Sequence, residues 1–490
     1  MTGDSAVTST VSVAPPTSSV RVPTASVQNL PIANRSFTAL AQLAPGVTGT
    51  QALGTRANMS TNFTMDGIST MDTGSNTVML QMNTESSTVV KVLISNYQAE
   101  YGRSSGIQIS AVTKSGTNRF RGSVYDVERN SKWDANSRTN ILNELPKTIS
   151  KQKDWGYSIG GPIGKPGGHN KLFFFNAVEF RPRTGGNDLQ TFRVPTALER
   201  KGDFSQTLDN NGNLYPFIKD PQLSGACNAT SQAACFADGG VVGRIPADRL
   251  YQPGLAILNM WPMPTSSTIV GTNLQFIRPA EDTLAYQPAF RFDYQAMPSL
   301  RVSYKYQGQI TRQQVNQGTI PGWNDTVTPF TGVGTDAASI NYNLGPTMFL
   351  EGTFGRAWNK QGSYQVNPVS DSRTVGLANF PLLFPNAAVI NPAYYGHSAL
   401  TAGKPAAPYW DGTRVWKVPN FSWGNRIAGA PPNVGLNNLR EHPTWDVSIS
   451  LTKVAGRHTM KTGYYSNHSL KRESVGVFGT SFGRDRKSVV

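Results

Sequence analysis

From residue 118 onward, apolar and polar side chains alternate in segments of about ten residues. The first three segments are residues 120–129, 153–163 and 171–181. Alternation with a period of two places the apolar side chains on one face of a β-strand, and about ten residues of a tilted strand are enough to cross a lipid bilayer. The glycine-rich stretch 160–170 predicts a hairpin between the second and third segments. We therefore expect a fold built of long antiparallel strands.

Further segments of this kind bring the expected number of crossing strands to eight or nine: 288–296, 300–309, 347–358, 445–451 and 458–470. Two intervals between strands, residues 186–281 and 360–440, are long and rich in Pro. Structureless loops of this length are uncommon in a compact soluble domain. Membrane barrels, in contrast, combine long loops at one end with short turns at the other. The loop lengths therefore favour a membrane barrel.

The composition agrees with a chain of many strands and turns. Hydrophobic residues make up 38% of the 490 residues and charged residues 15%, whereas Gly occurs 47 times. A soluble enzyme of this length usually contains more Leu, Ala and Glu. No run of about 18 apolar residues occurs, so we do not expect a transmembrane helix.

Aromatic residues are predicted at several strand ends. Within the second segment, Trp155, Tyr157 and Ile159 are expected to share one strand face. Four tryptophans near strand ends are candidates for an interfacial girdle: Trp133, Trp155, Trp261 and Trp445. Packing within loops is the alternative.

The formal net charge of +15 is unevenly distributed. Residues 1–113 contain five basic and five acidic side chains, whereas residues 114–201 contain sixteen basic and eight acidic ones. In a barrel, Lys and Arg near strand ends face anionic lipid headgroups or line a wet interior. This placement is favoured over nucleic-acid binding, so outer-membrane lipid is expected as a partner and nucleic acid is not.

The residues before the strand series form two regions. Residues 1–27 are rich in Ser, Thr and Pro and predict an extended linker. Residues 28–117 predict a small α/β domain, with a helix over 36–43 that Pro45 and Gly46 end. Short strands are expected around 63–68, 89–94 and 107–112.

Six motifs follow one another in an order that resembles a known family: NLPIANRSFTALAQLAPGV (29–47), FTMDGIS (63–69), SNYQAEYGRSSG (95–106), VTKSGTNRFRGSVY (112–125), GGPIGK (160–165) and VPTALERKGDFS (194–205). This series resembles the Oar-like TonB-dependent receptors of the bacterial outer membrane. The resemblance implies a mainly β fold. Residues 28–117 would be an α/β plug, and residues 118–484 would be the N-terminal part of an antiparallel transmembrane β-barrel. Since such receptors close with about twenty-two strands, we expect this barrel to be incomplete.

The same resemblance implies a function. The chain would bind or move a ligand through a plugged barrel, with energy supplied through TonB, and it would carry out no covalent chemistry. No cofactor or metal is expected. The aromatic and Asn/Gly-rich loops 186–281 and 360–440 suggest a glycan or a peptide as the ligand. The alternative is a secreted or surface β-rich adhesion protein that binds carbohydrate.

Two pairs of residues are candidate sites. By the resemblance, Arg103 and Lys114 are plug residues that could form ionic latches to the barrel wall; the alternative role is in turns and packing. Cys227 and Cys235 predict a short-loop disulfide in an oxidising compartment, with two free thiols as the alternative. Their spacing has no second Cys/His pair, so a zinc site is not expected.

Enzymatic motifs are weak. Two G-x-S-x-G matches, at 102–106 and 479–483, are not placed between a strand and a helix as a nucleophile elbow requires. Residues 160–165 lack the spacing and the Ser or Thr of a phosphate-binding loop. The five histidines are scattered. We therefore predict that the protein is not an enzyme.

The two ends of the sequence predict a fragment. Residues 1–26 have no basic start and no apolar core, so they do not form a signal peptide. We expect the native chain to begin upstream of Met1. Residues 485–490 are predicted to be a non-native tail, with a coincidental basic terminus as the alternative.

Overall fold

The protein is described from a computed structural model. Within it, the residues whose structure is described are 18–23, 42, 45–48, 51–52, 61–72, 77–80, 83–95, 97, 101, 106–209, 211–252, 255, 258–259, 261–265, 270–312, 314–316, 326–328, 331–365, 438–475 and 488–489. None of the helices in these ranges is both long enough and apolar enough to span a membrane.

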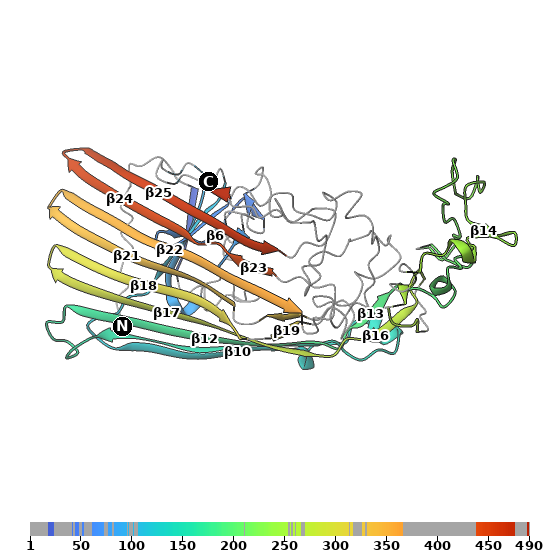
Figure 1. Cartoon of the computed structure of the whole chain (residues 1–490). Helices are drawn as coiled ribbons and strands as arrows, with labels where there is room; N and C mark the ends of the chain where they lie inside the picture. The colour runs from blue at the N-terminus through green and yellow to red at the C-terminus, as the bar shows by residue number, and fades with distance from the viewer. Residues whose placement is uncertain are drawn as a thin grey trace, which may run out of the picture.

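Long antiparallel strands form one large curved sheet, which is the dominant feature in Figure 1. Each long strand pairs with its neighbours along the chain. The long strands are β10 (Arg121–Asn130), β11 (Ile149–Pro162), β12 (Leu172–Gly186), β17 (Glu281–Met297), β18 (Leu300–Thr311), β21 (Thr331–Gly345), β22 (Met348–Gln365), β24 (Thr444–Ala455) and β25 (His458–Val475). The predicted fold class is confirmed. Among the described residues β10 and β25 do not pair with each other, so the barrel is open.

Shorter strands extend the same sheet: β19 (Gln314–Asn316), β20 (Thr326–Thr328), β23 (Asn438–Glu441) and β26 (Ser488–Val489). Strands β23 and β24 both pair with β22 and β25, so they act as one wall strand that is interrupted at His442 and Pro443. Proline cannot donate a ladder hydrogen bond, which accounts for the interruption.

In a soluble sheet the apolar side chains of a strand are buried and the polar ones are exposed, but in these strands the apolar side chains are exposed and the polar ones are buried. On β11, Trp155, Tyr157 and Ile159 are 43%, 39% and 42% exposed, which confirms their predicted shared face. The opposite face is polar and buried, and its members include Asp154, Ser158, Glu179, Gln287, Asp293, Ser303, Lys305 and Gln307. An apolar outer face and a polar inner face are the pattern of a barrel that lies in lipid and has a wet lumen.

The connections at the two ends of the sheet differ in length (Figure 1). At one end, strands such as β17 and β18 are joined across two residues, Pro298 and Ser299. At the other end, residues 187–280 join β12 to β17, and residues 366–437, which follow β22 in the sequence, lie outside the described residues. The first, which we call the loop module, contains β13 (Leu189–Phe192) paired with β16 (Leu274–Ile277), and β14 (Ala237–Asp238) paired with β15 (Val241–Val242). It also contains the 3₁₀ turns η5 (Glu199–Lys201) and η6 (Ala247–Arg249).

A shorter connection between β10 and β11 carries η4 (Ser131–Trp133) and the helix α2 (Arg138–Leu142), whose N-cap is Ser137. The second long interval falls on residues 366–437, so the predicted loop 360–440 lies almost entirely outside the described residues. Its predicted first residues belong to β22, because Lys360–Ser363 pair with β23.

A five-stranded sheet of order β1-β8-β9-β4-β5 lies in the region for which a plug was predicted, and we call this domain the plug. Its strands are β1 (Ser18–Pro23), β8 (Ser87–Ser95), β9 (Gln108–Thr113), β4 (Asn62–Met65) and β5 (Ile68–Ser69). Strand β4 pairs with β9 in parallel, and the other pairs are antiparallel. The core is apolar and includes Phe63, Met65, Val90, Val92 and Ile109.

Smaller elements of the same domain are β2 (Val47–Thr48), β3 (Gln51–Ala52), β6 (Met71–Asp72), β7 (Thr77–Val78) and η3 (Thr84–Ser86). Strand β1 corrects the prediction that residues 1–27 are wholly a linker, because Ser18–Pro23 supply an edge strand that pairs with β8. The helix predicted over 36–43 lies outside the described residues except for residue 42.

Candidate functional site

The turn between β4 and β5 is one of the parts of the plug that contact the barrel wall. Asp66 and Gly67 both have positive φ, 52° and 89°, a conformation that Asp-Gly turns favour. The Asp66 carboxylate accepts a hydrogen bond from the Thr113 amide (3.0 Å) and another from the Thr113 hydroxyl. The turn is thereby tied to the end of β9.

Three wall residues bind this corner of the plug. Lys305 Nζ lies 3.4 Å from Asp66 Oδ1, and the two side chains are only 10% and 4% exposed. Gln307 Nε2 donates to Thr113 Oγ1 (2.6 Å), and Arg291 Nη1 donates to the Thr113 carbonyl oxygen (2.8 Å). Because charge-assisted hydrogen bonds in a buried site are stronger than neutral ones, this cluster is the main polar attachment of the turn.

The residues after the turn bind a different part of the wall. Asp446 of β24 accepts a hydrogen bond from the Ser69 amide (2.6 Å) and one from the Tyr465 hydroxyl (2.8 Å). Asp72 of β6 lies 2.9 Å from Nδ1 of His442, which is buried at the interruption between β23 and β24. Carboxylates of the wall and of the plug thus both take part.

One apolar side chain fits into the wall between these polar contacts. Ile68 is fully buried and packs against Ala337 and Ala357. A Cβ atom added to Gly355 would lie 2.8 Å from Ile68 Cδ1, so only glycine leaves room for the isoleucine at this point of β22. These small wall residues form a socket for Ile68.

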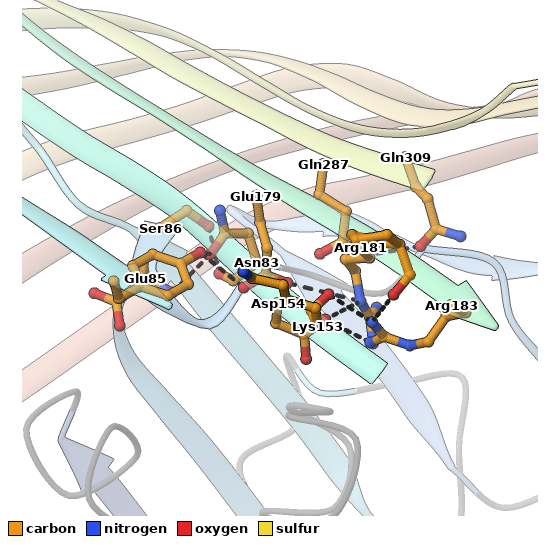
Figure 2. A network of polar contacts seen from close by, with 12 residues as sticks. Asn83, Glu85, Ser86, Lys153, Asp154, Glu179, Arg181, Arg183, Gln287 and Gln309 are labelled. Carbon is orange, nitrogen blue, oxygen red and sulfur yellow. Dashed lines mark hydrogen bonds and ion pairs between the residues drawn. The ribbon is translucent and has the colours of Figure 1, made fainter. Parts of the chain in front are cut away.

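A third attachment joins η3 to strands β10–β12 and is drawn in Figure 2. The Tyr125 hydroxyl donates to Glu179 (2.7 Å) and lies 3.4 Å from Oδ1 of Asn83 in the plug. Arg181 binds Asp154 at 3.3 Å and lies 3.8 Å from Glu179. Because Glu179 and Asp154 are buried, these partners offset the cost of removing their charges from water.

The two predicted latch residues are placed differently. Arg103 lies outside the described residues. Lys114 lies 3.8 Å from Glu85, so this ionic contact is within the plug rather than across to the wall. Burial lowers the pKa of Lys114, and the charge of Glu85 opposes this shift. A latch role for Arg103 or Lys114 therefore stays a prediction.

The loop module is held by buried charges of its own. Glu199 accepts hydrogen bonds from the Thr196 amide (2.7 Å), the Thr207 hydroxyl (2.6 Å) and Arg193. Arg200 donates to three carbonyl oxygens, those of Pro195 (3.1 Å), Leu258 (3.0 Å) and Pro262 (2.7 Å). Burial lowers the pKa of Arg200. Residues of the motif VPTALERKGDFS therefore bind parts of the loop module that are distant in sequence.

A second part of the loop module is fixed by an ion pair and a disulfide. Arg249 binds both carboxylate oxygens of Asp220 and lies over the ring of Phe236, 4.8 Å from its centroid. The hydrogen bond from Arg249 lowers the pKa of Asp220. Cys227 and Cys235 are joined by a disulfide, with their Cα atoms 4.9 Å apart. Neither cysteine is a free thiol in this structure.

Catalytic and metal-binding arrangements were sought in the same residues. Among the described parts of the chain, no group of three or more His, Cys, Asp or Glu side chains could hold a metal ion. The buried carboxylates at the plug are engaged by Lys, Arg, Thr or backbone donors. What this arrangement can do chemically is hold a polar domain against a polar wall.

Comparison with known proteins decides the family. Residues 112–482 match the family described as outer membrane beta barrel domain. The chain belongs to this family. It is similar to the TonB-dependent transporter Oar of Myxococcus xanthus, with 35% identity over 153 residues that cover 29% of this chain and 14% of that protein. The outer membrane transporter YddB of Escherichia coli has the same fold, with a TM-score of 0.50 and 10% identity. That match covers 93% of this chain and 48% of that one, so this chain spans about half of its length.

As an outer membrane beta barrel protein, the chain lies in the bacterial outer membrane, which confirms the predicted resemblance and location. The apolar outer face of the sheet is the face that contacts lipid. Long loops mark the extracellular end of such barrels and short turns the periplasmic end, so the loop module is extracellular.

Two of the four tryptophans predicted for the girdle lie in different surroundings. Trp155 is exposed on the lipid-facing side and stacks on Phe180 at a centroid distance of 4.3 Å. Trp261, in contrast, is 2% exposed within the loop module. Its girdle placement was wrong, because the loop has a core of its own that takes up this side chain.

The wall partners of the plug were missed by the sequence analysis. Lys305 and Gln307 lie in the segment SYKYQGQ, where polar residues alternate with tyrosines. The signal that could have found them is this inverted alternation, in which the polar face of a barrel strand faces the lumen. Their pairing with Asp66 and Thr113 depends on the fold and has no local signal.

Proposed function

We propose that this chain is the plug and part of the barrel of a TonB-dependent outer-membrane receptor similar to Oar, which binds or moves a ligand through its lumen without covalent chemistry. The observation that carries the proposal is the polar attachment of the plug, centred on Asp66, Lys305 and Asp446. Hydrogen bonds exchanged for water change the free energy by only about 1 kcal/mol each. A plug held in this way can leave the wall and return.

Within this proposal the Asp66–Lys305 pair is the ionic latch that Arg103 and Lys114 were predicted to provide. TonB is the proposed partner, and its pull would separate the plug from the wall. Two features support a polar contact rather than an apolar seal: the pair is buried, and its neighbours Thr113 and Gln307 are also hydrogen-bonded.

The test is the accessibility of a buried plug residue in living cells. Ser69 is 1% exposed and lies against Asp446. In the complete protein, a Ser69→Cys variant is expected to react with a periplasmic maleimide several times faster in cells that contain TonB than in cells that lack it. The exposed Thr117→Cys variant is the matched control and should react equally in both. Equal reaction rates for Ser69→Cys in the two kinds of cell would contradict a dependence on TonB and favour the alternative, a β-rich adhesion protein.

We also propose that the loop module selects the ligand, and that the ligand is a glycan or a peptide. The module exposes apolar and aromatic side chains to the extracellular side, including Leu214 (59%), Tyr215 (38%) and Tyr251 (48%). Arrays of glycans and peptides probed with the complete protein test this. A variant that lacks residues 187–280 should lose the signal, and a signal that survives the deletion would contradict the proposal.

A further inference from the structure

On strands β21 and β22, the first charged side chains of the lipid-facing side come only after a series of uncharged outward positions. On β22, the outward positions Met348, Leu350 and Phe354 precede the first charged one, Arg356. On β21, counted from the same turn, the first outward charge is Asp336. Nine residues of a strand tilted by about 40° rise roughly 23 Å. Since the apolar band of such barrels is about 25 Å tall, these charges lie where the headgroups of the outer leaflet begin.

Three neighbouring strands contribute to a polar cluster at this level. Arg356 Nε donates to Asp336 Oδ2 (2.9 Å), and the Tyr304 hydroxyl donates to Asp336 Oδ1 (3.0 Å). The side chain of Asp336 is 21% exposed, whereas that of Arg356 is 55% exposed. Asp336 therefore acts as a positioning residue that fixes the guanidinium of Arg356 against the barrel.

Beside this cluster the outer surface is hollowed. The hollow has a volume of about 270 Å³ and is lined by Tyr304, Asp336, Ala337, Ala338, Phe354, Gly355, Arg356 and Trp445. Its lining combines small residues of β21 and β22 with the aromatic rings of Tyr304, Phe354 and Trp445. The hollow thus presents apolar and aromatic surface together with one exposed cation, which is the chemistry of a lipid with an anionic headgroup.

The remaining donors of Arg356 are available to such a headgroup. Guanidinium has five N–H donors in a planar fork that matches a phosphate. Among the described residues, Nε of Arg356 has Asp336 as its partner, and neither Nη atom donates to a protein acceptor. Lys153 and Asp126 form an ion pair at 3.0 Å on β11 and β10, also on the lipid-facing side, and Lys153 provides a matched comparison.

We propose that this hollow, the outer-leaflet site, binds the phosphate-bearing headgroup of an outer-leaflet lipid. Arg356 binds the phosphate through its Nη donors, Asp336 and Tyr304 hold Arg356 in place, and Phe354 and Trp445 contact the adjoining apolar part of the lipid. The inference rests on the outer-membrane location of the chain and is independent of transport and of TonB.

Binding of diphosphoryl lipid A to the complete protein in detergent micelles, measured by native mass spectrometry, tests the proposal. Arg356→Gln is expected to weaken binding about tenfold or more, because a charge-assisted bidentate contact is lost. Lys153→Gln removes an equal charge elsewhere on the same face and should change binding less than about twofold. Equal weakening by both variants, or none by Arg356→Gln, would overturn the site.

Two further arms identify the ligand group. Lipid A from which phosphatase has removed the phosphates should bind wild type as weakly as intact lipid A binds Arg356→Gln; undiminished binding would contradict phosphate recognition. A large excess of inorganic phosphate should not displace lipid A; displacement would show that free phosphate fills the same contact and would count against a site specific for the lipid. Heat-modifiable gel migration checks folding of each variant. Should Arg356→Gln not fold, Arg356→Lys, which keeps the charge but loses the fork, is expected to weaken binding several-fold, and unchanged binding would count against the site.

Discussion

The plug and the loop module both bury charged side chains, but the charges are bound to different partners. In the plug, Asp66 and the Ser69 amide bind residues of the wall, Lys305 and Asp446. In the loop module, Glu199, Arg200 and Asp220 bind groups of the same module, which a disulfide also closes. The plug thus depends on the barrel for its position, whereas the loop keeps its own shape.

This difference separates two kinds of opening. Loss of a wall residue that binds the plug should release the plug without affecting the loop module. Loss of a residue that holds the loop module together should loosen that module without affecting the plug. Native-state hydrogen exchange resolves the two, because amides in each region report the free energy of their own local opening.

The largest effect is expected for Lys305→Met. The substitution leaves the buried Asp66 carboxylate without its cation, which costs about 3 kcal/mol when a buried pair is broken. Hydrogen exchange of plug amides such as that of Asp66, bonded to the Ala111 carbonyl oxygen, should accelerate accordingly, with loop amides unchanged. Lys453→Met, at a partly exposed position that contacts Thr347, is the control. An unchanged plug would contradict the latch.

The double substitution of Cys227 and Cys235 by Ser is expected to destabilise the loop module by about 2.5 kcal/mol, the loop-closure entropy of so short a ring. The amide of Asp220, which donates to the Ala234 carbonyl oxygen, reports this opening. Exchange in the plug should stay at the wild-type rate, and a coupled change in both regions would show that they do not open independently.

A smaller change is expected for Tyr125→Phe. The hydroxyl that binds Glu179 and contacts Asn83 is lost, at a cost of about 1 to 2 kcal/mol for a buried acceptor that loses a donor. Exchange near η3 should increase. Tyr157→Phe, on the lipid-facing side of the neighbouring strand, is the control and should have no effect on the plug. Equal exchange in both variants would remove this contact from the plug attachments.

Acid should loosen the loop module. The hydrogen bond from Arg249 lowers the pKa of Asp220 below its ordinary value of 3.8. A carboxylate with a depressed pKa in the folded state contributes stability above its unfolded pKa, and this stability is lost as the pH falls through the folded value. Loop exchange, corrected for intrinsic rates, should therefore rise below about pH 4. Asp220→Asn should reduce this acid dependence but not abolish it, because the hydrogen bond of Ser205 also lowers the pKa of Asp203 in the same module; an undiminished dependence would contradict the role of Asp220.

The smallest effect is expected for Lys114→Met, below about 1 kcal/mol. Loss of the contact with Glu85 and relief of the desolvation cost oppose each other. Because burial lowers the pKa of Lys114, its charged form costs stability at neutral pH, and this cost falls as the pH rises through the folded pKa toward 10.5. Hydrogen exchange of the plug amides, corrected for intrinsic rates, should therefore slow as the pH rises toward 10.5 in wild type but not in Lys114→Met. An effect as large as that of Lys305→Met would support the latch predicted at Lys114.

The wall strands were predictable where apolar and polar residues alternate strongly. Trp155, Tyr157 and Ile159 mark one face of β11 in the sequence as in the structure. Strand β21 was missed, because Thr331–Gly345 has mostly small or polar residues on its inner face, apart from Val333, and few large apolar ones on its outer face. Strand β1 was missed because six residues within a Ser/Thr-rich region resemble a linker.

The attachment of the plug could not be predicted in the same way. The Asp66-Gly67 pair identified a turn, and the motifs identified the plug, but Lys305 and Asp446 are distant in sequence and lie on strands whose neighbours are set by the whole sheet. Lys114 was chosen for its motif and charge, and the structure gives it a partner inside the plug. The charge of a side chain alone does not specify the residue with which it pairs.

The fit of Ile68 into its socket defines the position of the plug on the wall. Hydrogen-bonding groups on a polar wall can find substitute partners one or two residues along a strand, so a returning domain held only by them could settle in several registers. Ile68 packs against Ala337 and Ala357, and a Cβ atom at Gly355 would lie 2.8 Å from its Cδ1, so a larger residue at that point of β22 would clash with it. Under the proposed function, the polar contacts would allow the plug to leave the wall, and the fit of Ile68 would set the position to which it returns.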